Sequence, residues 1–142
     1  ETLIKTVKLI AEGKAPRTPQ DNSRATKCSV IKKEMGDICW GKSAEDIRNL
    51  VRALNPVPGA YTSYCGERLK IWKVAVTDRE RGCHAPGEIV EASARGGLFV
   101  CAGDKVLEIT ELQAVGGKRM SAKEYLRAHI FDTGQVFTQE AR

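Results

Sequence analysis

The sequence has no long uninterrupted apolar run and no apolar segment near its N-terminus. A membrane-spanning helix needs about 18 or more consecutive apolar residues, and a secretory signal needs an apolar core close to the N-terminus. We therefore expect a cytoplasmic protein with no membrane partner. The chain begins with Glu1, already inside a helical pattern formed by Leu3, Val7 and Ile10. This start indicates a piece of a longer protein.

The cysteines lack the patterns of metal or disulfide sites. There are five, an odd number, and none forms a C-x-x-C pair. Zinc sites need closely spaced ligand pairs, and secreted disulfide frameworks usually need an even count. We expect free thiols in a reducing compartment and no metal. The two histidines, His84 and His129, have no partner carboxylate in a motif and are interpreted as structural residues.

The glycine pair near Lys118 lacks the pattern of a nucleotide-binding P-loop. The stretch "VGGKRM", residues 115–120, has no hydroxyl residue after Lys118 and no first glycine at the required offset. Ser121 and Glu124 instead form a predicted capping box that starts a helix. Lys118 and Arg119 then precede a helix N-terminus, where cations oppose the helix dipole and favour an anionic partner. A neutral, solvent-exposed basic turn is the alternative.

Aromatic residues make up only 6% of the chain, so few side chains can stack on nucleic-acid bases. Four positions are candidates, although each is more often a core residue: Tyr61, Tyr64, Trp72 and Phe99. For any nucleic-acid ligand, we therefore expect phosphate contacts to dominate over base readout.

Positive charge is concentrated in residues 14–33. The segment holds six cations against Asp21, an excess equal to the net charge of +5, and they are Lys14, Arg17, Arg24, Lys27, Lys32 and Lys33. Pro16, Pro19 and the polar residues around them are typical of a linker. An extended basic segment is suited to a nucleic-acid backbone, because each neutralised phosphate releases counterions. A solvated tether is the alternative.

A helix is predicted after Ser43, which is an N-cap residue followed by two acids. Ile47 and Val51 fall on its apolar face, and "NPVPG", residues 55–59, ends it. Arg48 and Arg52 lie one turn apart on the opposite face. They are either solvent-exposed charges or a second small cationic patch.

From Ala60 onward the apolar period changes to two, which is typical of strands. Five runs separated by glycine-containing turns or by a polar loop follow one another: "AYTSYC", "RLKIWKVAV", "EIVEAS", "GLFVCA" and "VLEITELQ". Short strands at regular spacing favour a small barrel. The predicted fold is therefore mainly β, a small open OB-like barrel of about five or six strands with flanking helices.

Several stretches resemble the linker and C-terminal domain of the bacterial methionyl-tRNA formyltransferase family. The most specific are "RALNPVPGA" at residues 52–60, "APG" at residues 85–87, and "LQ" at residues 112–113 leading into "GKRMSA" at residues 117–122. The likeness covers Glu1 to about His129. It departs from the family at Lys27, where family linkers often carry another residue, and in the variable tail after His129, whose role is open.

The resemblance implies a protein with two domains. In the family, an N-terminal α/β domain binds 10-formyltetrahydrofolate and supplies a catalytic asparagine, histidine and aspartate, none of which can be matched here. We therefore expect no catalytic residue and no cofactor in this chain, and no activity on its own. The C-terminal barrel of the family helps to hold the initiator tRNA. This chain would do the same as a monomer, packed against its own catalytic domain.

The resemblance also implies domain limits. The last helix of the absent α/β catalytic domain would occupy residues 1–13, an extended basic linker residues 14–42, and the barrel domain residues 43–142. The residues predicted to bind tRNA phosphates are Arg24, Lys27, Lys32, Lys33, Lys118 and Arg119.

Two other functions are compatible with the same pattern. The barrel would be a structural module in a related formyltransferase, of the sugar-nucleotide type or of the type that hydrolyses or dehydrogenates formyl-tetrahydrofolate, neither of which needs RNA. It would otherwise be an independent single-strand-binding OB protein, which the scarcity of aromatic residues disfavours. The basic linker favours an RNA ligand.

Overall fold

The computed structural model describes residues 1–139, and the chain divides into two compact units, Glu1–Val30 and a second unit that begins at Ile31. The first unit contains helix α1 (Thr2–Ala11) and a short 3-10 helix, η1 (Asn22–Arg24). No side chain of α1 is buried, and its apolar residues Leu3, Ile4, Val7 and Ile10 are all exposed. Among the residues described, no helix is both long and apolar enough to span a membrane.

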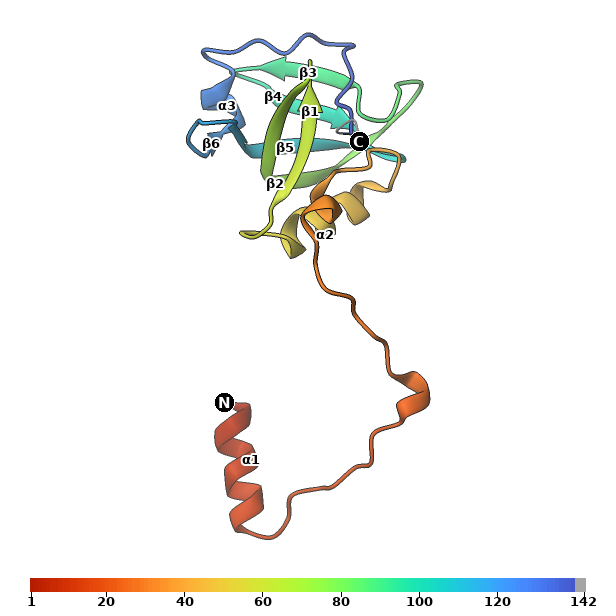
Figure 1. Cartoon of the computed structure of the whole chain (residues 1–142), viewed down its shortest axis with the longest axis vertical. Coiled ribbons are helices and arrows are strands. Elements are labelled where there is room, and N and C mark those ends of the chain that lie inside the picture. The colour runs from red at the N-terminus through yellow and green to blue at the C-terminus, as the bar shows by residue number, and fades with distance from the viewer. Residues whose placement is uncertain (140–142) are drawn as a thin grey trace. The chain divides into compact units, whose positions relative to one another are not determined.

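The second unit is built on one antiparallel sheet (Figure 1). Its strands lie in the order β1-β2-β5-β4-β3, with β6 paired to β5. This arrangement confirms the predicted mainly β fold, an open OB-like sheet of five or six strands with a few helices. The bounds are β1 (Ala60–Tyr64), β2 (Glu67–Glu80), β3 (Ile89–Ser93), β4 (Gly97–Cys101), β5 (Lys105–Ala114) and β6 (Met120–Ser121).

Helix α2 (Ala44–Ala53) packs against β2 and β5 through its predicted apolar face. Ile47 and Val51 are buried there, in one core with the inward side chains of the sheet. The Ser43 hydroxyl accepts a hydrogen bond from the backbone N–H of Asp46, so the predicted N-cap is confirmed. The helix ends before the two prolines, and the Gly59 amide bonds to the Leu54 carbonyl. Fully burying an Ile or Val side chain stabilises a fold by about 1.5–3 kcal/mol, so these two residues anchor the helix.

The segment before α2, residues 31–42, belongs to the second unit, whereas the linker expected from the sequence runs to residue 42. It contains a 3-10 helix, η2 (Lys33–Gly36), and two buried residues, Ile38 and Trp40. The Ile38 amide donates to the Tyr61 carbonyl at 2.9 Å, and the Trp40 indole N–H donates to the Thr62 hydroxyl at 3.0 Å. Residues 31–42 therefore contain part of the barrel's core, and Lys32 and Lys33 lie at the start of this packed segment.

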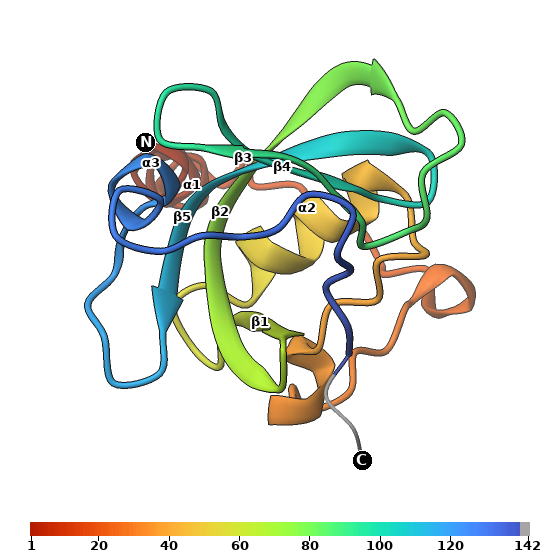
Figure 2. The same cartoon turned by 90° about the horizontal axis from the view of Figure 1, so that it is seen from above.

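The segment after α3 (Ala122–Tyr125) bridges the two edge strands of the sheet (Figure 2). Thr138 exchanges backbone hydrogen bonds with Ser63 of β1, and Phe137 donates to the Gly87 carbonyl just before β3. The Phe131 and Phe137 rings are buried and pack edge to face against each other, with centroids 5.5 Å apart. The tail, which has little pattern in the sequence, is therefore structural.

Two irregularities in the pairing of β2 with β5 change which side chains face outward. Ile71 pairs with Leu112 and Val74 with Ile109, and all four are buried. Between these pairs the register shifts once at Trp72 on β2 and once, in the opposite sense, at Thr110 on β5. A bulge adds one residue and redirects the neighbouring side chains. Two consecutive residues, Trp72 and Lys73, are therefore left outside the core.

Strand β2 also runs four residues further than predicted, from Val76 to Glu80. This polar stretch resembles a loop in sequence, yet Glu80 pairs with Lys105 and the Thr77 hydroxyl donates to the Val106 carbonyl at 2.7 Å. Its side chains are polar because they face solvent at the end of the sheet.

Candidate nucleic-acid interface

A groove of about 570 Å³ lies beside helix α2 and the irregular part of β2. Four cations line it, two from α2, one from β2 and one from the turn after β5: Arg48, Arg52, Lys73 and Arg119. Its other lining residues are Val51, Asn55, Trp72 and Val74. Volumes of about 300–1,000 Å³ are typical of ligand sites. The groove therefore combines a ligand-sized space, an aromatic ring and a local excess of positive charge.

Two of the four cations have carboxylate partners. Arg48 pairs with Glu45 one turn earlier on α2, and Arg119 pairs with Glu111 of β5. Arg52 instead donates to the Asn49 amide oxygen at 3.1 Å, and within residues 1–139 neither Arg52 nor Lys73 forms an ion pair. Among the four groove cations, Arg52 and Lys73 can therefore bind a phosphate without first losing a carboxylate partner. Exposed ion pairs contribute only about 0–1 kcal/mol, so Arg48 and Arg119 can also exchange theirs at a small cost.

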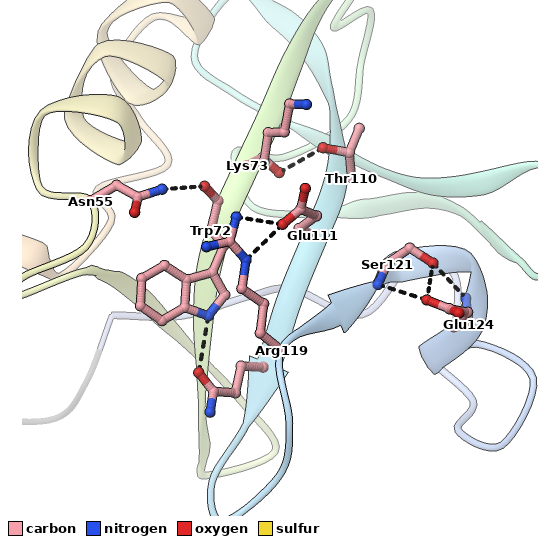
Figure 3. A network of polar contacts seen from close by, with 9 residues as sticks. Asn55, Trp72, Lys73, Thr110, Glu111, Arg119, Ser121 and Glu124 are labelled. Carbon is pink, nitrogen blue, oxygen red and sulfur yellow. Dashed lines mark hydrogen bonds and ion pairs between the residues drawn. The ribbon is translucent and has the colours of Figure 1, made fainter.

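Arg119 is held in place by Glu111 and by Trp72 (Figure 3). Its Nε and Nη2 atoms lie 2.7 Å and 2.5 Å from the same Glu111 carboxylate oxygen, Oε2. The guanidinium carbon lies 5.1 Å from the centroid of the Trp72 ring, within cation–π range. Arg119 therefore already has an acidic partner, Glu111, within the chain. The sequence analysis predicts instead that an anion outside the protein pairs with it at a helix N-terminus.

The turn before Arg119 and the helix after it have the predicted local structure. Lys118 is exposed in the turn between β5 and β6. The Ser121 hydroxyl accepts from the Glu124 amide, and Glu124 accepts from the Ser121 amide at 3.1 Å, so the capping box is confirmed. That helix, α3, has only four residues, and β6 separates it from Arg119.

The other predicted cations lie at different places along the chain. Arg24 ends η1 and Lys27 follows it, both exposed in the first unit. Lys32 and Lys33 are exposed at the start of η2 in the second unit. Of the six predicted residues, Arg119 alone lines the groove. The other five remain predicted phosphate contacts.

Helix α2, which carries Arg48 and Arg52, is fixed to the sheet by Asp104 in the turn between β4 and β5. The Asp104 carboxylate accepts from the Ala44 amide at 2.7 Å and from the Lys105 amide at 2.9 Å. The hydrogen bond from Ala44 is the main reason why the pKa of Asp104 lies below its usual value. Asp104, which lies 60 positions after Ala44 in the chain, thus connects the first turn of α2 to the turn between β4 and β5.

We expect Asp104→Ala to lower the melting temperature of this chain and to flatten its dependence on acid. A carboxyl whose pKa is lowered on folding stabilises the folded state above its unfolded pKa, about 3.9 for Asp, and loses that contribution as pH falls through the folded pKa. Thermal melts at pH 7 and between pH 5 and about 2 would measure both effects. A variant that keeps the acid sensitivity of the original chain would contradict this role.

Arg52, Lys73 and Asn55 were not among the predicted binding residues. For Arg48 and Arg52 the sequence allows either solvent-exposed charges or a small cationic patch, and the groove favours the patch. The sequence signal for Lys73 is the run "IWKV", residues 71–74, where apolar and polar residues fail to alternate. Such a failure is what a bulge produces.

The four candidate stacking residues have different environments. Tyr61 is buried, and Tyr64 packs edge to face on Phe131 with centroids 4.8 Å apart, so both belong to the core. Phe99 is partly exposed beneath Arg79, whose guanidinium carbon is 5.2 Å from its centroid. Trp72 is the candidate that lines the groove.

Both histidines have structural contacts, and His84, contrary to the expectation from the sequence, has a carboxylate partner. His84 Nδ1 lies 2.7 Å from the Glu88 carboxylate, and this hydrogen bond holds the pKa of Glu88 below its usual value. The same carboxylate accepts from the Ala85 amide, so the pair stabilises the loop before β3. His129 stacks on Tyr125 with centroids 4.0 Å apart. All five cysteines are unpaired, and no cluster of three or more metal-ligating side chains occurs within the described chain.

Comparison with known proteins places the second unit in a family. Residues 30–129 match the family described as "Formyl transferase, C-terminal domain". Among solved structures, the crystal structure of HypX from Aquifex aeolicus in complex with tetrahydrofolic acid has a TM-score of 0.60 at 16% identity, covering 87% of this chain and 22% of that one. At this identity the likeness concerns the fold alone.

Curated relatives are similar over almost the whole chain. A methionyl-tRNA formyltransferase of Carboxydothermus hydrogenoformans is 44% identical over 137 residues, which cover 96% of this chain and 44% of the relative. Those of Halothermothrix orenii and Clostridioides difficile are 38% and 40% identical, covering 94% and 96% of this chain and 44% and 43% of the relatives. This chain thus spans less than half the length of these relatives. On the family match, it belongs to the formyl transferase family and corresponds to its C-terminal domain.

Proposed function

We propose that this chain is the tRNA-binding C-terminal part of a methionyl-tRNA formyltransferase. The whole enzyme would formylate the amino group of methionyl initiator tRNA, with 10-formyltetrahydrofolate bound in an N-terminal catalytic domain in the cytoplasm. The observation that carries the proposal is the groove, which four cations and Trp72 line together in a domain of the formyl transferase family. The relatives named methionyl-tRNA formyltransferase support the choice of substrate.

The proposed role is to hold the tRNA by its phosphates so that the aminoacyl end reaches the active site of the other domain. Positioning a substrate in this way converts an encounter between two molecules into a reaction within one complex. Arg52 and Lys73 would contact phosphates directly, and Arg48 would do so by exchanging its carboxylate partner for a phosphate. Arg119 would keep its pairing with Glu111 and contact a phosphate through Nη1, which Glu111 leaves free. Lys32, Lys33, Lys118, Arg24 and Lys27 would extend this contact along the RNA.

A salt titration tests the proposal. The affinity of this chain for initiator tRNA should fall steeply as salt rises, because each contacted phosphate releases counterions. Lys32→Ala/Lys33→Ala should reduce the slope of log K against log [salt] by about 1.4–1.8, which is roughly 0.7–0.9 for each lost contact. Electrophoretic mobility shifts over a range of salt concentrations would measure it.

A matched double variant controls for the loss of charge. Arg95 lies in the turn between β3 and β4 and Arg127 follows α3; both are exposed, and neither lines the groove or is one of the predicted phosphate contacts. Arg95→Ala/Arg127→Ala removes the same charge and should leave the slope close to that of the original chain. Binding that is independent of salt, or equal to binding of an unrelated acidic polymer, would contradict the proposal and favour a structural module.

A further inference from the structure

Trp72 is held rigidly although it lies outside the core. Its indole N–H donates to the Gln113 side-chain oxygen at 3.0 Å, and Gln113 in turn donates to the Gly117 carbonyl at 2.8 Å. The six-membered part of the ring lies near Gly59, where an added Cβ would lie 3.7 Å from the ring atom Cη2. The hydrogen bond to Gln113 thus fixes one edge of the ring, which lowers the entropy lost when a ligand packs against it.

Two cations lie over the Trp72 ring. The Arg119 guanidinium carbon lies 5.1 Å and the Lys70 ammonium nitrogen 5.5 Å from the ring centroid. Glu111 fixes the orientation of Arg119 through two donors on one side of its guanidinium. Unpaired bases pack on aromatic rings and on arginine guanidinium planes. The Trp72–Arg119 pair is therefore a preformed surface of the kind that a base contacts.

The groove also offers partners for the other parts of a nucleotide. Arg52 and Lys73 supply positive charge without a carboxylate partner among residues 1–139. The Asn55 side-chain N–H donates a hydrogen bond to the Trp72 carbonyl at 3.2 Å, and the Asn55 side-chain oxygen accepts no hydrogen bond from the described residues. That oxygen is an acceptor suited to the edge of a base. A base inside a duplex is covered on both faces by its neighbours and cannot enter such a groove.

We propose that the groove binds one unpaired nucleotide of the RNA, with its base against the Trp72–Arg119 pair and its phosphate at Arg52 and Lys73. The inference rests on the proposed function, because it takes the ligand to be an RNA. It adds a base contact to an interface that the sequence predicted to be dominated by phosphates. It also assigns Trp72 a role in recognising unpaired regions of the RNA.

The test compares the affinities of this chain for three ligands built of ribonucleotides: a single strand, a duplex and a free nucleotide. A single-stranded RNA of about eight nucleotides, a length that OB folds cover, should bind more tightly than a blunt duplex of the same sequence. It should quench the fluorescence of Trp72, whereas Trp40 is buried and gives a constant background. Adenosine monophosphate should compete weakly. Binding of the monophosphate as tight as that of the oligonucleotide would instead assign the groove to a free nucleotide and overturn the proposal.

Variants at Trp72 isolate the base contact. Trp72→Leu removes the aromatic face and should weaken binding of the single strand about tenfold, because the stacking contact of one base is lost. Binding of the duplex should be unchanged. Trp72→Phe keeps a ring and should restore most of the affinity, which separates stacking from damage to the fold.

The result also separates this inference from the proposed function. If Trp72→Leu folds normally and binds both ligands as the original chain does, the base contact is wrong while tRNA binding through phosphates stands. If the original chain binds no tRNA at all, the proposed function fails as well.

Discussion

Arg52→Ala/Lys73→Ala should weaken binding of initiator tRNA by about 100-fold at about 0.1 M salt. Both side chains line the groove, and neither has a carboxylate partner among the described residues. Each charge-assisted hydrogen bond to a phosphate contributes about 1.5 kcal/mol or more, and about 1.4 kcal/mol is a factor of ten in affinity. Fluorescence polarisation with labelled tRNA would measure the change.

A second double variant, for comparison, removes the two cations of the same groove that already have acidic partners. Arg48→Ala/Arg119→Ala deletes the same formal charge but frees Glu45 and Glu111, so the loss of affinity should include new repulsion from two carboxylates. Adding Glu45→Gln and Glu111→Gln should recover part of it, whereas the Arg52 and Lys73 variant has no such acid to neutralise. Equal binding by the Arg52→Ala/Lys73→Ala variant and the original chain would place the tRNA on another surface.

Local sequence signals predicted the elements that local interactions determine. The Ser43 cap and the spacing of Ile47 and Val51 predicted α2, and the Ser121–Glu124 capping box predicted the start of α3. Alternation of apolar residues predicted the strands, and their number with the turns between them predicted an open OB-like sheet. These features depend on residues a few positions apart, so they can be read from one sequence.

The groove depends on contacts that no local pattern specifies. Its cations come from α2, β2 and the turn after β5, which only the folded sheet brings together. The two compensating shifts between β2 and β5 expose Trp72 and Lys73, and their register is set across the sheet rather than along the strand. The pairing of Arg119 with Glu111, eight residues earlier, likewise requires the turn that brings them together.

The role of the tail, the segment after His129, is the other feature that cannot be predicted from the sequence. Phe131 and Phe137 lie six residues apart in a segment that forms one bridge to β1 and one to Glu88, just before β3, so it has no sustained period of two. The burial of Phe131 and Phe137 depends on where the edges of the sheet lie in the folded chain, and no local pattern gives that position. The tail therefore contributes to the barrel that supports the groove.

Gly87→Ala should lower the free energy of unfolding by about 2–5 kcal/mol, because Gly87 lies where the tail meets the sheet. Its φ is +86°, and an added Cβ would lie 2.5 Å from the Phe137 carbonyl oxygen. An L-residue in this conformation costs roughly 1–2 kcal/mol, and the forced displacement of a packed segment roughly 1–3 kcal/mol more. The displacement would also strain the bond from the Phe137 amide to the Gly87 carbonyl.

Gly134→Ala is the matched control for this variant, since Gly134 has the same φ of +86° but no atom within 4 Å of an added Cβ. It should therefore show only the conformational cost of about 1–2 kcal/mol. Urea unfolding of both variants measures the difference, which isolates the contact between Gly87 and the tail. Equal losses for the two variants would mean that the tail moves aside freely and that the barrel does not depend on it. A larger loss for Gly87→Ala means that residues 130–138, although they form no strand of the sheet, hold its edge strands β1 and β3 in place.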